Sequence, residues 1–250
     1  MIAAVVLGLL VGSFLNVCIY RLPRRESVAW PASHCPSCRR VLSWYENVPL
    51  VSWLVLRGRC RGCQTPISFQ YPIVEALTGA LFGAAYYWYG PTAIGVVRTL
   101  FGCAMIVLFV IDLQHRILPN VITVPGTVIG LVLSVLLPPG WVSSLIGVLV
   151  GGGLLFAMGE AYYRLRGVEG LGMGDVKMLA MIGAFLGWQL ALVTLMLASF
   201  SGAVIGVVLL ATRRGTMQAA LPFGTFLAVG AGVAAVVGDS LVTWYLSFYR

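Results

Sequence analysis

The chain has 250 residues, of which 60% are hydrophobic and only 10% are charged. A soluble globular domain has about 25% charged residues, so this composition excludes a water-soluble enzyme, a coiled coil and a disordered tail. The net charge of +8 is typical of a membrane protein whose basic loops set its topology. We therefore expect a polytopic membrane protein that binds no nucleic acid.

Long apolar stretches separated by polar segments predict the membrane spans. They cover residues 2–20, 71–89, 92–113, 121–137, 141–163, 176–211 and 222–248. A span needs about 20 residues, so the stretch 176–211 is too long for one, and we expect a turn in it at Gly187-Trp188-Gln189. The sequence thus predicts an all-α polytopic membrane protein with about eight transmembrane helices. Its parts would be a first transmembrane helix (1–20), a cytoplasmic loop domain (21–70) and a seven-helix membrane domain (71–250).

Basic residues gather in alternate loops of this arrangement. Of the 16 lysines and arginines, 14 follow the first, third, fifth or seventh span, and only Arg98 and Arg250 lie elsewhere. Under the positive-inside rule these loops are cytoplasmic and both termini lie outside. The first stretch has its arginines after it, the reverse of a signal peptide, so we expect an uncleaved span. A seven-span arrangement is disfavoured because it would move Arg213 and Arg214 to the other side.

Four cysteines predict a metal site in the polar loop. Cys35 and Cys38 form one C-x2-C pair, and Cys60 and Cys63 form a second one after 21 further residues. The two pairs fit a structural zinc site with four thiolates, although their separation slightly exceeds the usual spacing of about 15–20 residues. Disulfides are disfavoured in the reducing cytoplasm, and a redox role lacks a thioredoxin-like context. His34 is expected to be a bystander, because four thiolates complete a zinc site.

Acidic residues are rare, and five of the eight lie within or at the ends of apolar stretches. They are Glu75, Asp112, Glu160, Asp175 and Asp239. An ionisable group there is costly and is therefore a functional candidate. Asp112 and Asp175 both fall at cytoplasmic ends of predicted spans. Glu160 precedes Arg164 by four residues, the spacing of a helix ion pair, and Asp239 lies near the outer end of the last span.

Two carboxyl groups on one side of a membrane suggest aspartyl hydrolysis. Such a pair shares one proton. The ionised member takes a proton from a water that attacks a peptide carbonyl, and the protonated member hydrogen-bonds that carbonyl. A Ser/His/Asp site is disfavoured because His34 and His115 are the only histidines. Each aspartate also has a simpler interpretation, Asp175 as a helix cap and Asp112 as an interfacial charge.

Five motifs, in order, closely resemble those of the bacterial type IV prepilin leader peptidases, the GxGD class of intramembrane aspartyl proteases. The motifs are Gly12-Ser13-Phe14-Leu15-Asn16-Val17 with Arg21-Leu22-Pro23, the two C-x2-C pairs, Tyr71-Pro72-Ile73-Val74-Glu75, Asp112 with Leu118-Pro119, and Gly172-Met173-Gly174-Asp175-Val176-Lys177. The resemblance covers nearly the whole chain. Two positions depart from it, since Asn120 stands where the family commonly has Asp and Gln70 where it commonly has Arg.

The resemblance implies that Asp112 and Asp175 are the catalytic pair, supported by Gly172, Gly174 and Lys177. It implies cleavage of the short leader of type IV prepilins or type II secretion pseudopilins, after a Gly, at the cytoplasmic face of the bacterial inner membrane. These substrates and membrane lipid are the expected partners.

Many members of this family also N-methylate the new N-terminus with S-adenosylmethionine. That activity and its cofactor follow from the resemblance alone, with Glu75 as a possible methyltransferase or substrate-site residue. Glu75 is otherwise a buried polar link between helices. The alternatives are a peptidase without methyltransferase activity, an ion-coupled transporter and a scaffold whose zinc loop binds a partner.

Overall fold

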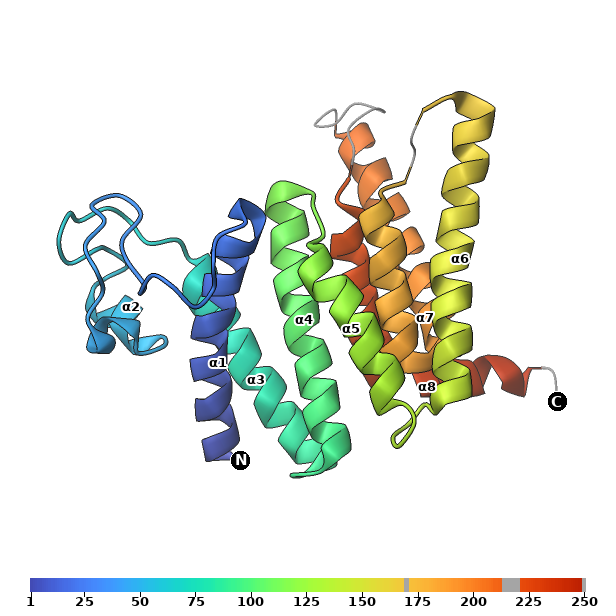
Figure 1. The fold of residues 1–250 in the computed structure, drawn as a ribbon, viewed down its shortest axis with the longest axis horizontal. Coiled ribbons are helices and arrows are strands. Elements are labelled where there is room, and N and C mark those ends of the chain that lie inside the picture. Colours follow the sequence, from blue (N-terminus) through green and yellow to red (C-terminus); the bar gives the residue numbers. More distant parts are fainter. Residues whose placement is uncertain (169–170, 213–220, 249–250) are drawn as a thin grey trace. The chain divides into compact units, whose positions relative to one another are not determined.

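We describe the fold from a computed structural model, which places residues 1–168, 171–212 and 221–248. This part of the chain is all-α, as predicted, and holds two isolated β-bridges but no named strand (Figure 1). Its helices are α1 (Ile2–Arg21), η1 (Leu22–Arg24), η2 (Trp44–Asn47), α2 (Val51–Val55), α3 (Gln70–Tyr89), α4 (Ala93–His115), α5 (Asn120–Leu133), α6 (Trp141–Arg166), α7 (Met173–Ala211) and α8 (Phe223–Ser247). Arg213, Arg214 and Arg250, used above to predict topology, lie outside the described residues.

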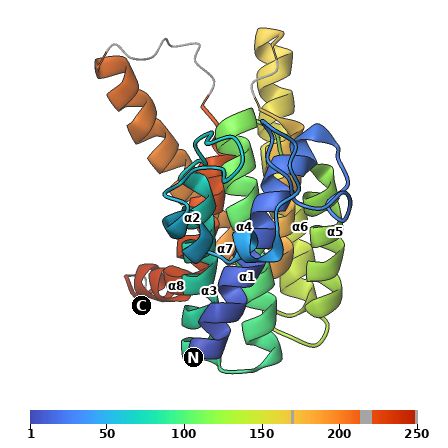
Figure 2. The same ribbon diagram turned by 90° about the vertical axis from the view of Figure 1, so that its left-hand side faces the viewer.

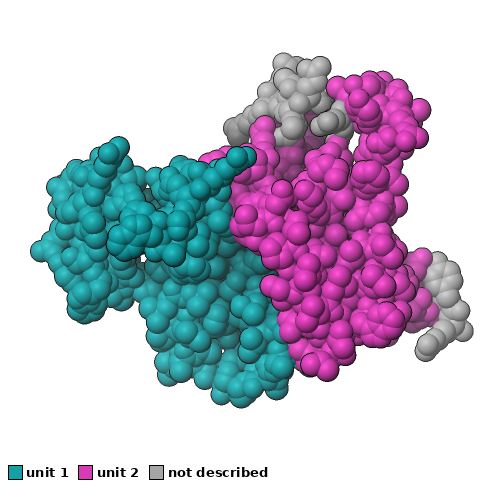
Figure 3. All heavy atoms as spheres, viewed as in Figure 1, with its two compact units in different colours: residues 1–107 teal, residues 108–250 magenta. Residues whose placement is uncertain are grey.

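The chain divides into two compact units, Met1–Val107 and Leu108–Arg250, with the boundary inside α4 (Figure 3). In the first unit α1 packs closely on α3. A Cβ added to Gly12 would lie 2.7 Å from the Cα of Glu75, and one added to Gly79 would lie 2.9 Å from Leu9 Cδ2. Small residues let two helix backbones approach without a side chain between them. This contact fixes Glu75 against α1.

The second unit is built around α7, which packs against α5, α6 and α8. Met178, Leu179 and Ile182 of α7 are fully buried in its core. The helix breaks at Gly187, whose φ of 82° and ψ of 172° are not helical. A Cβ there would lie 2.5 Å from Ser143 Oγ, so the position needs glycine on two grounds. The turn predicted inside the stretch 176–211 is therefore confirmed.

Five helices in the described residues are long and apolar enough to cross a membrane, not eight. They are α1 (extended through Arg24), α4, α6, α7 and α8. With 14 residues, α5 is only about 21 Å long, shorter than the roughly 30 Å hydrocarbon core. The 20-residue α3 is long enough but is not among the five on composition, and the 39-residue α7 counts once despite its break. The all-α class is confirmed, and the protein is a multi-pass membrane protein.

Candidate functional site

Asp112 lies near the C-terminal end of α4 and is 4% exposed. Its Oδ2 accepts a hydrogen bond from the backbone N–H of Thr225 (2.7 Å) and another from the Thr225 hydroxyl (3.0 Å). Thr225 belongs to the first turn of α8, where backbone N–H groups have no partner within the helix. The start of α8 therefore fixes one oxygen of this carboxyl group. No hydrogen bond to its Oδ1 occurs among the described residues.

Asp175 lies in the first turn of α7, at the fourth position of the Gly-Met-Gly-Asp motif. Its backbone N–H donates to the carbonyl oxygen of Gly172 (3.1 Å). A Cβ added to Gly172 would lie 3.2 Å from Asp175 Oδ2. The carboxyl group of Asp175 is half-buried, and the missing side chain of Gly172 leaves room beside its Oδ2.

Leu118 connects the surroundings of the two aspartates. A Cβ on Gly174 would lie 3.0 Å from Leu118 Cβ. A Cβ on Gly224 would lie 2.9 Å from Leu118 Cδ1 and 3.0 Å from Asp112 Oδ2. The carboxyl groups of Asp112 and Asp175 are also within electrostatic range of each other. The ends of α4, α7 and α8 thus bring together two carboxyl groups that are 63 residues apart in sequence.

Lys177 and Asn120 extend this site. Lys177 Nζ donates a hydrogen bond to Asn120 Oδ1 (3.0 Å), which joins the start of α7 to the start of α5. Asn120 is one of the two positions that depart from the motif pattern. The amide oxygen accepts from lysine in the way that an aspartate at this position would, without its negative charge.

Glu75 belongs to the first unit, whereas both aspartates belong to the second. Its side chain is buried, and Oε2 accepts the backbone N–H of Leu50 (2.8 Å). Ser13 is a further hydrogen-bond partner. One turn along α1, Asn16 donates to the Tyr71 carbonyl (3.1 Å), while its buried Oδ1 has no partner among the described residues. Glu75 therefore joins α1, α3 and the polar loop.

The four cysteines come together, with all four Sγ atoms within 4.8 Å of one another. Each pair is carried by the same kind of turn. The N–H of Cys35 bonds the Arg40 carbonyl (3.0 Å), and the N–H of Cys60 bonds the Thr65 carbonyl (2.9 Å). The fourth residue after each first cysteine, Arg39 or Gln64, has a positive φ. The two pairs thus form matching knuckles that direct their thiols toward one point.

Two of the four thiols, those of Cys60 and Cys63, have lowered pKa values, which favour the thiolate form. Hydrogen bonds from the hydroxyl and backbone of Thr65 lower the pKa of Cys63 to about 6, and backbone N–H groups of Cys63 and Gly62 lower the pKa of Cys60. Although the Arg40 N–H acts in the opposite direction, burial and neighbouring thiols raise the pKa of Cys38 to about 11. Thiolates are the form that binds metal, and a divalent cation would relieve their mutual repulsion.

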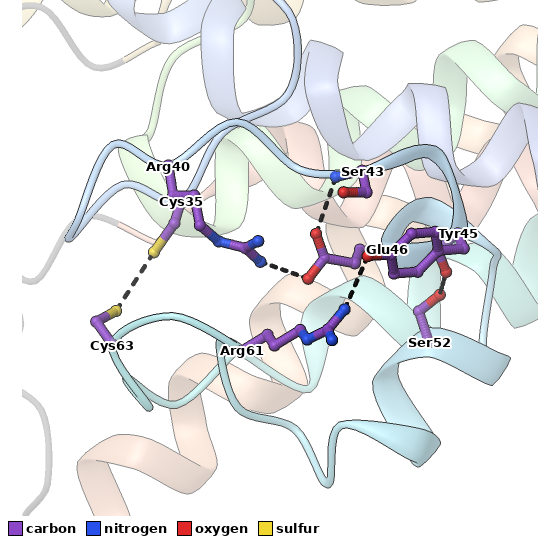
Figure 4. Close-up of polar contacts among 8 residues, drawn as sticks. All are labelled: Cys35, Arg40, Ser43, Tyr45, Glu46, Ser52, Arg61 and Cys63. Carbon is purple, nitrogen blue, oxygen red and sulfur yellow. Dashed lines mark hydrogen bonds and ion pairs between the residues drawn. The ribbon is translucent and has the colours of Figure 1, made fainter.

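An ion pair braces the knuckles from one side (Figure 4). The carboxylate of Glu46 accepts the Ser43 N–H (2.9 Å) and forms an ion pair with Arg40. The Ser43 N–H and the Arg40 guanidinium hold the pKa of Glu46 below its usual range. Arg61, from the second knuckle, donates to the Tyr45 hydroxyl (2.7 Å). The segment between the knuckles is therefore tied to both.

The structure also shows where the other acidic residues and the histidine singled out in the sequence lie. Glu160 forms an ion pair with Arg164 (2.8 Å), as its spacing predicted, and Asp239 is exposed. His34 Nδ1 lies 3.1 Å from the Ala32 carbonyl oxygen and is outside the cysteine cluster. Sequence reasoning missed Thr225, whose only signal is its place after Pro222 at the start of an apolar helix.

Comparison with known proteins gives two family matches. Residues 6–89 match the Bacterial Peptidase A24 N-terminal domain, and residues 99–207 match the Type IV leader peptidase family. A relative from Aeromonas hydrophila named prepilin leader peptidase/N-methyltransferase is 38% identical over 96% of this chain and 91% of its own. A relative of the same name from Myxococcus xanthus is 48% identical over 84% of this chain and 63% of its own. Another from Stutzerimonas stutzeri is 36% identical over 100% of this chain and 94% of its own. No solved structure gives a significant match.

Proposed function

The chain belongs to the type IV leader peptidase family, and we propose that it cleaves the short leader of type IV prepilins or type II secretion pseudopilins and N-methylates the new N-terminus. Relatives that align with nearly the full chain are named for both activities. The observation that carries the peptidase proposal is that Asp112 and Asp175 lie within electrostatic range of each other, with Leu118 against the glycines beside them.

The two aspartates would act as a pair that shares one proton. The ionised carboxylate takes a proton from a bound water, and the water oxygen attacks the carbonyl carbon of the peptide bond after the leader Gly. The protonated carboxyl donates a hydrogen bond to the carbonyl oxygen as its negative charge develops. Thr225 holds Oδ2 of Asp112, so Oδ1 is the oxygen presented to water or substrate.

The proposed location is the cytoplasmic face of the bacterial inner membrane. Asp112 is four residues before Arg116, and Asp175 is two residues before Lys177, so both carboxyl groups lie at basic helix ends. We propose that α7 crosses the membrane twice, divided at Gly187, and that α3 and the apolar stretch 121–137, of which α5 is only the helical part, cross it once each. The first helix (1–20), the loop domain (21–70) and the membrane domain (71–250) are the proposed parts.

The four cysteines would hold a structural zinc ion. Tetrahedral zinc with Zn–S bonds of about 2.3 Å places its sulfurs roughly 3.8 Å apart, and Cys35 Sγ lies 3.7 Å from Cys63 Sγ. We expect Cys63→Ser to lose bound zinc in elemental analysis of the purified protein. Cys103→Ser, which changes a buried thiol in α4, should keep it. Equal zinc in both variants would contradict the site.

The proposed methylation would depend on hydrogen-bond acceptors at and near Glu75. S-adenosylmethionine carries a positive sulfonium and an amino group. The Glu75 carboxylate and the unpartnered Oδ1 of Asn16 are acceptors suited to such cations. When bound, this cofactor supplies the methyl group. The chain's own part would be to position the new N-terminus, and a peptidase without this second activity is the alternative.

The deciding experiment is cleavage of a prepilin-like substrate in liposomes by the wild type, Asp112→Asn and Asp175→Asn. We expect the wild type to cut after the leader Gly and each variant to lose cleavage. Product mass with and without S-adenosylmethionine then reports methylation separately, and Glu75→Gln should affect only that mass shift. Cleavage at the wild-type rate by either aspartate variant would refute the aspartyl mechanism.

A further inference from the structure

The short helix α2 presents an apolar face that nothing in the described residues covers. Val51, Leu54 and Val55 are 55%, 66% and 75% exposed. They lie at positions i, i+3 and i+4, so they share one side of the helix. Trp44 of η2, the helix that α2 packs against, is 81% exposed. We call these four residues the α2 face.

The other side of α2 is committed to the loop domain. Ser52 Oγ donates to the Tyr45 carbonyl (2.7 Å), which ties α2 to η2. The Trp53 ring packs on Phe69 with centroids 4.7 Å apart and lies against Gly58. The orientation of α2 is therefore set from inside the domain, and the apolar side is the one turned outward.

The contact between Leu50 and Glu75 sets how far α2 lies along α3. Leu50 directly precedes α2, and its N–H bonds Glu75, five residues after the start of α3. At about 1.5 Å per residue, this places the start of α2 roughly 7 Å inside the beginning of α3. In Figure 1 and Figure 2 α2 lies beside α1 rather than beyond its end.

The charge of the domain matches an anionic surface. Residues 21–70 contain eight arginines and two glutamates, a net charge of +6. Four thiolates with a divalent metal would carry a charge of about −2 and leave the segment basic. Six of the arginines are exposed, namely Arg24, Arg25, Arg39, Arg57, Arg59 and Arg61. Anionic phospholipids of the cytoplasmic leaflet attract such clusters.

We propose that the α2 face lies in the boundary between headgroups and acyl chains of the bilayer that holds α1 and α3. Interfacial helices bury an apolar face about 5–10 Å into this boundary, with tryptophan and basic residues at its rim. The depth set by Glu75, the exposed apolar side and the arginines all fit this partner. The inference rests on the proposed membrane topology, but not on the peptidase chemistry.

Tryptophan quenching in nanodiscs with anionic lipid tests this placement. The difference in emission between the wild type and Trp44→Phe isolates Trp44. We expect lipids brominated near the headgroup end of their acyl chains to quench most of this difference, and aqueous iodide to quench little of it. Leu54→Asp combined with Val55→Asp should reverse that order, because two carboxylates would leave the boundary. Asn47→Asp, which adds a charge at an exposed polar position of η2, should not.

The remaining outcomes overturn the proposal in distinguishable ways. Quenching of Trp44 by iodide and not by lipid would mean that the α2 face is in water. Protection from both quenchers would mean that protein covers it. If Trp141 of α6 and Trp188 of α7 also escape the lipid quencher, the membrane topology itself is wrong. Retained zinc in the double Asp variant would show that its loop domain is still folded.

Discussion

Thr225 gives Asp112 two hydrogen bonds of different kinds, and one substitution separates them. Thr225→Val removes the hydroxyl bond (3.0 Å) and keeps the backbone bond (2.7 Å). A hydrogen bond to an ionised group contributes about 1.5–3 kcal/mol, so we expect kcat for prepilin cleavage to fall about 10- to 100-fold with KM nearly unchanged. Thr225→Ser keeps the hydroxyl and should retain near wild-type kcat. Equal kcat for the Val and Ser variants would show that the hydroxyl does not position Asp112.

Glu46 makes the stability of the loop domain depend on pH. Its pKa is lowered in the fold, by the Ser43 N–H first and also by Arg40. Its contribution is therefore complete above the usual glutamate pKa of about 4.3 and is lost as pH falls through the lower folded value. We expect Glu46→Gln to lower the free energy of unfolding at pH 7 by on the order of 1 kcal/mol, because water screens the partly exposed Arg40.

Denaturant unfolding of reduced, metal-free protein, followed by tryptophan fluorescence, measures this difference. Thiol protonation then contributes equally to the wild type and to Glu46→Gln. The difference between the two should shrink as the pH is lowered below about 4. A difference that stays constant down to the lowest pH would mean that the Glu46 charge adds nothing to the fold.

At the scale of the element, α8 provides its own matched pair of glycines. A Cβ on Gly224 would press on Leu118 and on Asp112 Oδ2, whereas one on Gly232 would meet nothing within 4 Å. We expect Gly224→Ala to reduce cleavage by at least about tenfold, since a misplaced catalytic group is costly. Gly232→Ala should cleave like the wild type. The assay is initial cleavage rate at equal amounts of inserted protein, and equal rates for both variants would refute close packing at Gly224.

The helices differ in how far the sequence predicts them. The break in α7 follows from a length that no single span can have, together with a glycine at its middle, and it is confirmed. The length of α5 does not follow, because apolar residues continue to position 137 after the helix has ended at Leu133. The five-residue α2 has no predictable period. It is stabilised by the contacts of Ser52 and Trp53 rather than by its own propensity.

At the scale of the whole molecule, local patterns predict ligands and acids but not their long-range partners. The cysteine cluster was predictable because C-x2-C spacing encodes each knuckle locally, and it is found in the structure. The roles of Asp112 and Asp175 remain a prediction, although Leu118, which lies against Gly174 and Gly224, belongs to the same sequence motif as Asp112. Thr225 lies 113 residues from Asp112, and only the packing of α8 in the second unit connects them.

The charge pattern predicts the orientation of the whole molecule, and exposed positions at or beyond helix ends can test it. Pro91 and the 88% exposed Leu136 lie at ends without basic residues, whereas His115 and the 83% exposed Leu165 lie at basic ends. We expect a membrane-impermeant maleimide on intact cells to label Pro91→Cys and Leu136→Cys but not His115→Cys or Leu165→Cys, since arginines stay on the cytoplasmic side. After detergent lysis all four should react more than the wild type, whose exposed Cys38 and Cys63 also react, and this excess controls for exposure. Labelling of the basic-end pair in intact cells would invert the topology and put both aspartates on the outer face, where a leader on the cytoplasmic side could not reach them.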